Sequence, residues 1–397
     1  MSRGKGAAAW LAAAAAVLAF CVIMYGAFVR LSNAGLSCPD WPTCYGKVTW
    51  PKLPHDIARA DAAFPHRPVE AHKTWREQTH RMAAGTLGAL VLALALSAVW
   101  RRGWARWSTL AAALSAALAV ALYMSGERIV SSALGGLAIA LPLAVAWRLP
   151  RAPPWRWAVV ALALVIFQAA LGMWTVTLLL KPIVVMGHLL GGMALFAVLA
   201  YIALRLHGLG ATDDSLRGLR RAAGVGVLLL ACQIALGGWT SSNYAALACG
   251  YGASAFPQCL GQWWPPMDFG QGFVLWRGIA VDFQGGILDL PARTAIQMVH
   301  RIGALVVFVY LAALVWHAAR RRLPGYAAAI GVALVAQVLL GISNVHFALP
   351  LPVATAHNGM AALLLCSLLV LLARTQPRPD AQSRLAEPAT LGGQPAV

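Results

Sequence analysis

Glu77-Gln78-Thr79-His80-Arg81 places a carboxylate and an imidazole three residues apart, at the start of an apolar run that ends near Trp100. Positions i and i+3 lie on one face of a helix, so Glu77 and His80 are expected to point the same way. The similar stretch Gln297-Met298-Val299-His300-Arg301 has an amide in place of the acid. This difference between two related segments is the clearest indication of function in the sequence.

The composition predicts an all-α polytopic membrane protein. Of the 397 residues, 60% are hydrophobic and 11% are charged, whereas about 25% of the residues in a soluble domain are charged. The net charge of +18 does not indicate nucleic acid binding, because no basic helix with interleaved aromatic residues is present and because Lys and Arg concentrate in cytoplasmic loops. The first apolar run lacks a small-residue cleavage site and is expected to be a retained helix.

Apolar segments of about 20 residues predict about ten transmembrane helices. The predicted spans are 8–29, 78–100, 107–124, 129–147, 157–179, 183–204, 222–241, 294–316, 326–346 and 353–373. Alternating loops and both termini hold 18 of the 31 Lys and Arg residues. The chain is therefore expected in the bacterial inner membrane with both termini cytoplasmic and with long outer loops at 31–76 and 242–291. The polar tail 375–397 is expected to be disordered.

An internal repeat is visible in the spacing of glycine, cysteine and histidine. Gly26 precedes Cys38 by twelve residues, and Gly237 precedes Cys249 by the same twelve. The glycine of Gln168-Ala169-Ala170-Leu171-Gly172 precedes a histidine by sixteen residues, as does the glycine of Gln337-Val338-Leu339-Leu340-Gly341. These spacings predict two pseudosymmetric four-helix bundles, in 1–205 and 206–374, with the helix pair in 107–147 inserted into the first as a peripheral hairpin.

Four helical histidines occupy equivalent positions of the repeat, two in each half: His80, His188, His300 and His357. Ionisable groups within a membrane are costly and usually mark a functional site. Two imidazoles at equal depth on different helices suit the axial ligation of a haem iron, whereas zinc requires three or four close ligands. Arg81 and Arg301 follow two of these histidines and can either pair with carboxylates of the bound ligand or extend to lipid headgroups.

Two cysteine pairs lie at matching points of the two outer loops: Cys38 with Cys44, and Cys249 with Cys259. An oxidising outer compartment permits disulfides. Each pair can simply staple its loop, and the first pair can alternatively be redox-active. The remaining three cysteines lie in apolar helices and are expected to be packing residues.

The order of motifs resembles the haem A synthase family over nearly the whole chain. The first half contributes Gly26-Ala27-Phe28-Val29-Arg30-Leu31-Ser32, Gly35-Leu36-Ser37-Cys38-Pro39-Asp40-Trp41-Pro42, Glu77-x-x-His80-Arg81, Gly172-Met173-Trp174-Thr175-Val176-Thr177 and Gly187-His188-Leu189-Leu190-Gly191-Gly192. The second half adds Leu236-Gly237-Gly238-Trp239-Thr240, Val299-His300-Arg301 and Thr355-Ala356-His357-Asn358-Gly359. Family members have eight helices in two pseudosymmetric halves, so the helix pair in 107–147 departs from the family pattern without touching a motif.

The resemblance implies an oxidoreductase that converts the C8 methyl group of haem O to a formyl group, by successive hydroxylation and loss of water. His300 and His357 would hold a haem B cofactor, and His80 and His188 would bind the substrate haem O. Glu77 would be the catalytic carboxylate, since an acid beside a methyl group under oxidation can stabilise a cation or take up a proton. Cys38 and Cys44 would accept or relay electrons, with Cys249 and Cys259 as the second pair.

The expected partners are membrane lipid, haem O, the synthase that supplies it, cytochrome oxidase assembly factors and an unidentified electron-transfer partner. A rival interpretation is a dihaem electron-transfer or quinol-oxidising protein, which would also use four helical histidines. A transporter, which the repeat alone would favour, predicts broken helices at mid-membrane, whereas the polar positions here lie near the outer ends of the helices.

Overall fold

The computed structural model describes residues 2–149, 154–210 and 215–377. Within these ranges ten helices are long and apolar enough to cross a membrane, which confirms the ten predicted spans. They are α1 (Ser2–Leu31), α3 (Ala71–Val99), α4 (Gly103–Met124), α5 (Arg128–Arg148), α6 (Trp155–Thr177), α7 (Pro182–Leu206), α8 (Arg217–Ser242), α10 (Leu290–Arg320), α11 (Pro324–His346) and α12 (Leu351–Thr375). Helix α12 continues to Thr375, the first residue of the predicted tail. Residues 378–397 of that tail lie outside the described residues.

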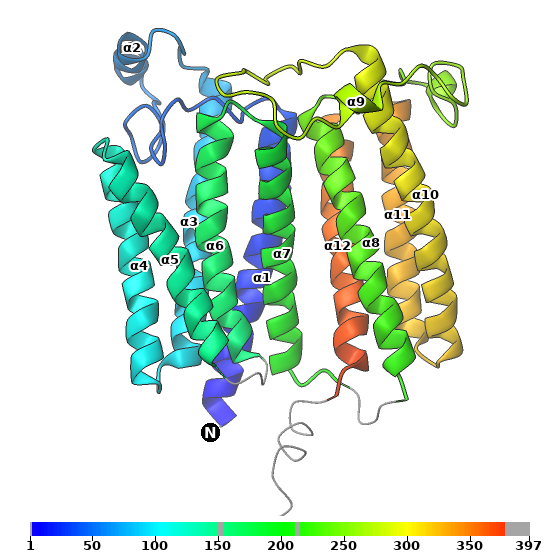
Figure 1. Cartoon of the computed structure of the whole chain (residues 1–397), viewed down its shortest axis with the longest axis horizontal. Helices are drawn as coiled ribbons and strands as arrows, with labels where there is room; N and C mark the ends of the chain where they lie inside the picture. The colour runs from blue at the N-terminus through cyan, green and yellow to red at the C-terminus, as the bar shows by residue number, and fades with distance from the viewer. Residues whose placement is uncertain (1, 150–153, 211–214, 378–397) are drawn as a thin grey trace, which may run out of the picture.

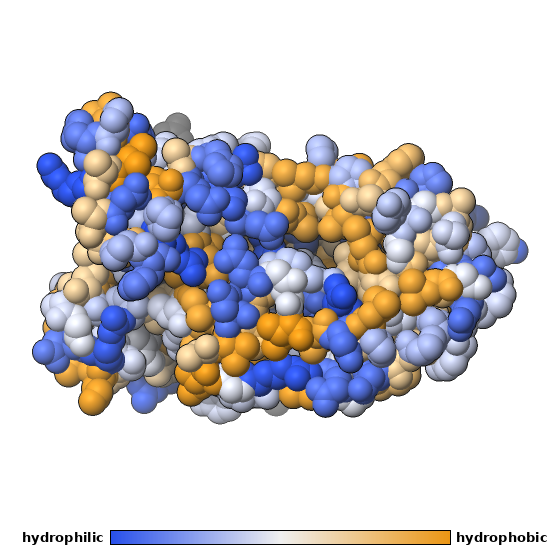
Figure 2. Space-filling model, turned by 90° about the horizontal axis from the view of Figure 1, so that it is seen from above, coloured by the Kyte–Doolittle hydropathy of each residue, from blue (hydrophilic) through white to orange (hydrophobic). Residues whose placement is uncertain are grey.

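The helices stand side by side, and the two long loops gather on one face of the molecule, here called the loop face (Figure 1). These loops carry three short helical segments: α2 (Pro54–Ala63), the 3-10 helix η1 (Ala253–Ala255) and α9 (Phe269–Gly272). Seen from above, the loop face mixes hydrophilic and hydrophobic residues (Figure 2). Its exposed aromatic side chains include Tyr251, Trp263, Trp264 and Trp276. Such amphipathic rings favour the boundary between hydrocarbon and water.

Two groups of four helices build the body of the molecule. Helices α1, α3, α6 and α7 pack against one another, and so do α8, α10, α11 and α12. The two groups meet where α1 and α7 pack against α12 and α8, and one hydrophobic core runs through both. We call them the first half and the second half.

The hairpin of α4 and α5 lies at the edge of the first half (Figure 1). The two helices pack against each other, and α5 covers α6. At the loop face, the Tyr123 ring makes an edge contact with the Trp41 ring, 5.8 Å between centroids, and the Arg128 guanidinium lies 3.9 Å from the Tyr123 ring centroid. The hairpin therefore supports the first loop from outside the four-helix group.

The second loop reaches back over the first half. Lys181, between α6 and α7, is 1% exposed. Its ammonium group donates to the carbonyls of Arg277 and Gly278 and lies 3.8 Å from the Trp276 ring centroid. Arg30 of α1, also in the first half, donates to the Ser241 carbonyl of the second half at 2.9 Å. These contacts fix the two halves to each other at the loop face.

The repeat extends from the helices into the loops. Cys44 and Lys47 exchange two backbone hydrogen bonds, and Cys259 and Gln262 do the same. The two residues inside each turn have positive φ, at 54° and 74° for Tyr45-Gly46 and at 53° and 72° for Leu260-Gly261. Glycine adopts such a conformation without steric cost. Both long loops therefore share this turn, although the cysteines before it are 6 residues apart in the first loop and 10 apart in the second.

Candidate functional site

Glu77 lies in the second turn of α3, beneath the first loop. The apolar run predicted that this helix begins near residue 78, but it begins at Ala71. The difference arises because Thr74, Glu77 and Gln78 are polar yet almost completely buried, at 0%, 4% and 2% exposed. The loop covers them, so their polarity does not mark the end of the helix.

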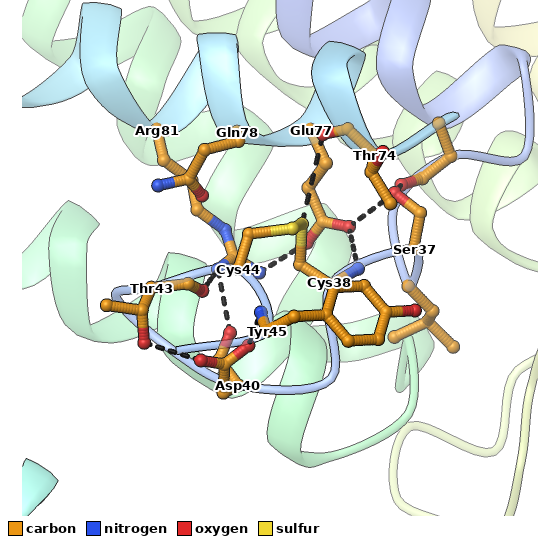
Figure 3. The surroundings of a disulfide bond; sticks show 12 residues. Ser37, Cys38, Asp40, Thr43, Cys44, Tyr45, Thr74, Glu77, Gln78 and Arg81 are labelled. Carbon is orange, nitrogen blue, oxygen red and sulfur yellow. Dashed lines mark hydrogen bonds and ion pairs between the residues drawn. A yellow bond between two sulfur atoms is a disulfide. The ribbon is translucent and has the colours of Figure 1, made fainter. Parts of the chain in front are cut away.

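Three donors converge on the Glu77 carboxylate (Figure 3). The backbone N–H of Cys38 donates to Oε2 at 2.9 Å, and the Ser37 hydroxyl lies 3.0 Å from the same oxygen. Arg81, one turn along α3, donates to Oε1 at 2.5 Å and forms an ion pair with the carboxylate. Charge-assisted bonds of this kind are roughly twice as strong as neutral ones, so the carboxylate is held in one position.

Arg81 also connects α3 to the first loop. Its Nη1 donates to the carbonyls of Asp40 and Thr43, at 2.7 and 2.6 Å. Asp40 in turn accepts hydrogen bonds from the backbone N–H groups of Tyr45 and Gly46. Two charged side chains, Arg81 and Asp40, thus hold the loop that covers Glu77.

The Cys38–Cys44 disulfide closes the same loop directly beside the acid (Figure 3). Both cysteines are 0% exposed, and the sulfur of Cys38 lies 3.8 Å from the Thr74 carbonyl oxygen of α3. Burial raises the pKa of the neighbouring Tyr45 phenol to about 12, and this hydroxyl donates to the Arg67 carbonyl at 2.9 Å. The disulfide is therefore enclosed between the helix and the rest of the loop.

The second half has a corresponding disulfide and a corresponding arginine that donates to a loop carbonyl, but it has an amide where the first half has the acid. A disulfide joins Cys249 and Cys259, and Nη1 of Arg301 donates to the Gln258 carbonyl at 3.0 Å. Gln297 occupies the position of Glu77 and is equally buried, at 4% exposed, but its Oε1 has no partner. Nε and Nη2 of Arg301 are also buried without a partner. Glu77 engages Nη2 of Arg81, whereas Nη2 of Arg301 has no such partner in the second half.

Each of the four histidines packs against a glycine of a neighbouring helix. A Cβ atom on Gly26 would lie 2.9 Å from Cε1 of His80, and one on Gly237 would lie 3.2 Å from Cε1 of His300. The corresponding distances are 3.4 Å from Gly172 to His188 and 3.1 Å from Gly341 to His357. The glycines of the sequence repeat are therefore the surfaces on which the imidazoles rest.

The histidines form one pair in each half. His80 interacts electrostatically with His188, and His300 with His357. Nδ1 of His80, His188 and His357 is buried without a partner, whereas Nδ1 of His300 accepts a hydrogen bond from Gln233 at 3.0 Å. Imidazoles with a free nitrogen in an apolar site remain available to a ligand.

These features suit a haem in each half. Among the described residues, no group of three or more His, Cys, Asp or Glu side chains could hold a metal ion. A haem iron takes its remaining ligands from the macrocycle, so two opposed histidines are sufficient. The glycines beside the imidazoles and the unpartnered ring nitrogens agree with such a ligand set.

Sequence reasoning assigned no role to several residues of this site. Ser37 appeared only within a motif, and Gln168 and Gln337 appeared only as markers of the repeat. The backbone N–H of Cys38 has no sequence signature at all. For Arg81 and Arg301 the sequence left open ligand carboxylates or lipid headgroups, and the structure turns one guanidinium nitrogen of each toward loop carbonyls.

Known proteins match almost the entire chain. The COX15-CtaA family model, described as cytochrome oxidase assembly protein, matches residues 9–134 and 122–369. A heme A synthase of Shewanella oneidensis is 37% identical over 365 residues, covering 91% of this chain and 94% of its own length. Heme A synthases of Rhizorhabdus wittichii and Mesorhizobium japonicum are 26% and 27% identical, over 92% and 90% of this chain and 93% and 86% of their own lengths. These similarities do not favour the dihaem electron-transfer interpretation.

Proposed function

The chain belongs to the COX15-CtaA family of cytochrome oxidase assembly proteins, and we propose from this that it is a haem A synthase. It oxidises the C8 methyl group of haem O to a formyl group through two hydroxylations and the loss of water. The observation that carries the proposal is the three-donor network around Glu77, in the half whose counterpart has an amide at the same place.

The first half, formed by α1, α3, α6 and α7, binds the substrate. His80 and His188 hold haem O from opposite sides, and Gly26 and Gly172 keep each imidazole close to its neighbouring helix. The hydrocarbon surroundings suit the long farnesyl chain of this haem. The propionates require the polar loop face, because charge is costly within the membrane.

In the second half, His300 and His357 would hold a haem B cofactor. When bound, haem B supplies a one-electron redox couple. Gln233 and Gln337 lie within hydrogen-bonding distance of these two imidazoles, at 3.0 and 3.3 Å, and orient them. Arg301 has two unpartnered donors and suits a propionate; Arg81 has fewer donors to spare because it holds Glu77 and two carbonyls.

Glu77 is the catalytic carboxylate. It lies three residues nearer the loop face than His80 on α3. The C8 methyl group of a haem neighbours a propionate, so propionates at the loop face bring the methyl group toward this end of the helix. The carboxylate can take up a proton or stabilise a cation at that carbon, and Arg81 balances its charge when it is buried.

The Cys38–Cys44 disulfide is suited to accept the electrons of one hydroxylation. Converting a methyl group and water to an alcohol releases two electrons and two protons, and a disulfide takes up two electrons and two protons when it becomes two thiols. The peptide N–H of Cys38 contacts the acid. The Cys249–Cys259 disulfide has no acid beside it and serves to hold its loop.

The loop face is the outer face of a bacterial inner membrane, and both termini are cytoplasmic. The distribution of Lys and Arg supports this orientation. An oxidising outer compartment agrees with the two disulfides. Lipid surrounds the helices, the synthase that makes haem O delivers the substrate, and cytochrome oxidase assembly factors and an electron-transfer partner act with the enzyme.

Expression in a host that makes haem O but no haem A tests this function. Extracted haems are separated and identified by mass. The proposal expects haem A, or its hydroxylated precursor, only in cells that carry the chain. Extracts that contain haem O unchanged, from cells with a folded and haem-loaded protein, would contradict it.

A further inference from the structure

Gln168 of α6 has a buried amide without a partner. The residue is 7% exposed, and both its Oε1 and its Nε2 are buried with no hydrogen bond. An amide without a partner is costly in apolar surroundings, and the hydrocarbon region has no water to compensate it. A buried amide of this kind indicates that a ligand supplies the missing partner.

The Gln168 amide packs directly against Gly191 of α7, where the missing side chain leaves room for it. A Cβ atom on Gly191 would lie 1.9 Å from Nε2 of Gln168, so a larger residue at this position would displace the amide. Because α7 begins at Pro182 on the loop face, Gly191 lies three residues deeper than His188. The free amide is therefore on the same side of the bundle as the haem ligand and about one turn farther from the loop face.

The second half uses the equivalent residues differently. Gln337 lies 169 residues after Gln168, as His357 does after His188. Its Nε2 lies 3.3 Å from Nε2 of His357, so this amide is engaged with the histidine. At the same spacing, Gly191 corresponds to Met360. Among the described residues, both amide atoms of Gln168 are without a partner, whereas Gln337 has its nitrogen engaged and only its oxygen free.

Haem O has a matching polar group. Its two propionates lie on one edge of the macrocycle, and a hydroxyethyl-farnesyl group lies on the opposite edge, where haem B carries a vinyl group. With the propionates at the loop face, the hydroxyl group points into the membrane, one turn or so below the histidines. An amide can both donate to and accept from a hydroxyl group.

We infer that Gln168 hydrogen-bonds the hydroxyl of the hydroxyethyl-farnesyl group and thereby selects haem O over haem B in the first half. The inference rests on the proposed function, because it takes His80 and His188 as the substrate site. A site built to hydrogen-bond a substrate hydroxyl discriminates against an analogue that lacks it, since the buried polar group is then left unpaired. Haem B, which the second half retains, is such an analogue.

Titration of haem O and of haem B into purified full-length protein, with its resident haem already bound, tests the inference. The wild type is compared with Gln168→Leu and with the matched control Gln337→Leu. Binding is followed by the Soret absorbance and by mass analysis of the haem that remains after gel filtration. Gln168→Leu removes an unsatisfied amide, so folding is expected to be retained; retention of the resident haem verifies this.

We expect Gln168→Leu to weaken haem O binding about tenfold, the equivalent of one hydrogen bond, and to leave haem B binding within about twofold. Gln337→Leu removes a contact of His357, so it should loosen the resident haem of the second half and leave the preference of the first half for haem O unchanged. An unchanged preference in Gln168→Leu, or equal weakening for both haems, would overturn the inference. If either of these results is found while the wild type still forms haem A, the inference fails and the proposed function stands. A wild type that binds haem O but forms no formyl product would instead refute the proposed function.

Discussion

The two halves of the molecule share a binding frame and differ in a few polar side chains. Both have two histidines resting on glycines, a disulfide-closed turn and an arginine that donates to a loop carbonyl. Among the described residues, the first half has a buried carboxylate under its loop and a glutamine with neither amide atom bonded, whereas the equivalent Gln337 contacts His357. We therefore propose that the shared histidines and glycines determine what each half binds, and that the differing polar side chains determine what happens to the bound group.

The difference is also electrostatic. In the first half, Arg81 and Glu77 neutralise each other in a buried position. In the second half, Arg301 faces an amide and retains a net positive charge with two unpartnered donors. The first half therefore carries a balanced ion pair at the proposed site of chemistry, whereas the second has a cation suited to an anionic ligand group.

Removing one histidine from each half should give the largest difference between them. His357→Ala should reduce the retained haem B by at least about 100-fold, because even the loss of an outer-shell partner of a metal ligand costs up to about that factor. His188→Ala should retain haem B and lose haem O binding instead. Haem extraction and mass analysis of the two purified variants distinguish these results. Equal loss of haem B from both would break the division into substrate and cofactor halves.

The two arginines should differ in their effect on stability. Arg81→Gln leaves the Glu77 carboxylate buried without its counter-charge, and it should lower the free energy of unfolding by about 3 kcal/mol. Arg301→Gln removes a cation that has no acidic partner and should change it by less than about 1 kcal/mol. Unfolding in a detergent titration measures both. Similar values for the two variants would argue against the electrostatic contrast.

Removal of either disulfide should destabilise the protein equally, whereas only removal of the first should reduce product formation. Replacing both cysteines of either pair by Ala should lower the free energy of unfolding by about 2 kcal/mol, because each closes a short loop. Only Cys38→Ala with Cys44→Ala should also reduce haem A formation at equal amounts of folded protein. If both double variants retain full product yield, the first pair is a staple like the second.

The smallest expected difference is between two glycines of the first half, in how much an added methyl group weakens haem O binding. Gly26→Ala places a methyl group 2.9 Å from His80 and should weaken haem O binding about tenfold, whereas Gly172→Ala at 3.4 Å from His188 is an ordinary contact and should change it less than about twofold. Soret titration with haem O measures both affinities. The reverse order would indicate that the His80 ring moves away easily and that Gly26 is not a close support.

The helices and the histidine set could be predicted from the sequence because they depend on local periodicity and on repeated spacing. The start of α3 could not, because Glu77 and Gln78 are buried by a loop that is distant in sequence. Lys181 was likewise no candidate for burial, since the carbonyls of Arg277 and Gly278 that accept its hydrogen bonds come from the other half. Burial of polar residues under loops is a tertiary property that hydropathy does not contain.

The acid itself was predictable, and its surroundings were not. The exchange of Glu77 for Gln297 is visible when the repeat is aligned. The partners of the carboxylate include a backbone N–H and the Ser37 hydroxyl, and neither has a distinguishing pattern in the sequence. The free amide of Gln168 required the structure as well, because only the contacts of Gln337 reveal that the two glutamines differ.

The yield of haem A from Glu77→Gln, measured by mass analysis in a host that makes haem O, tests the central claim most directly. The account predicts retained haem binding in both halves and a fall in product of at least about 100-fold, the usual scale for removing a catalytic acid or base. The matched control Gln297→Glu, at the equivalent position of the second half, should leave the yield within about twofold. An unchanged yield of haem A from Glu77→Gln would contradict the assignment of the chemistry to the first half.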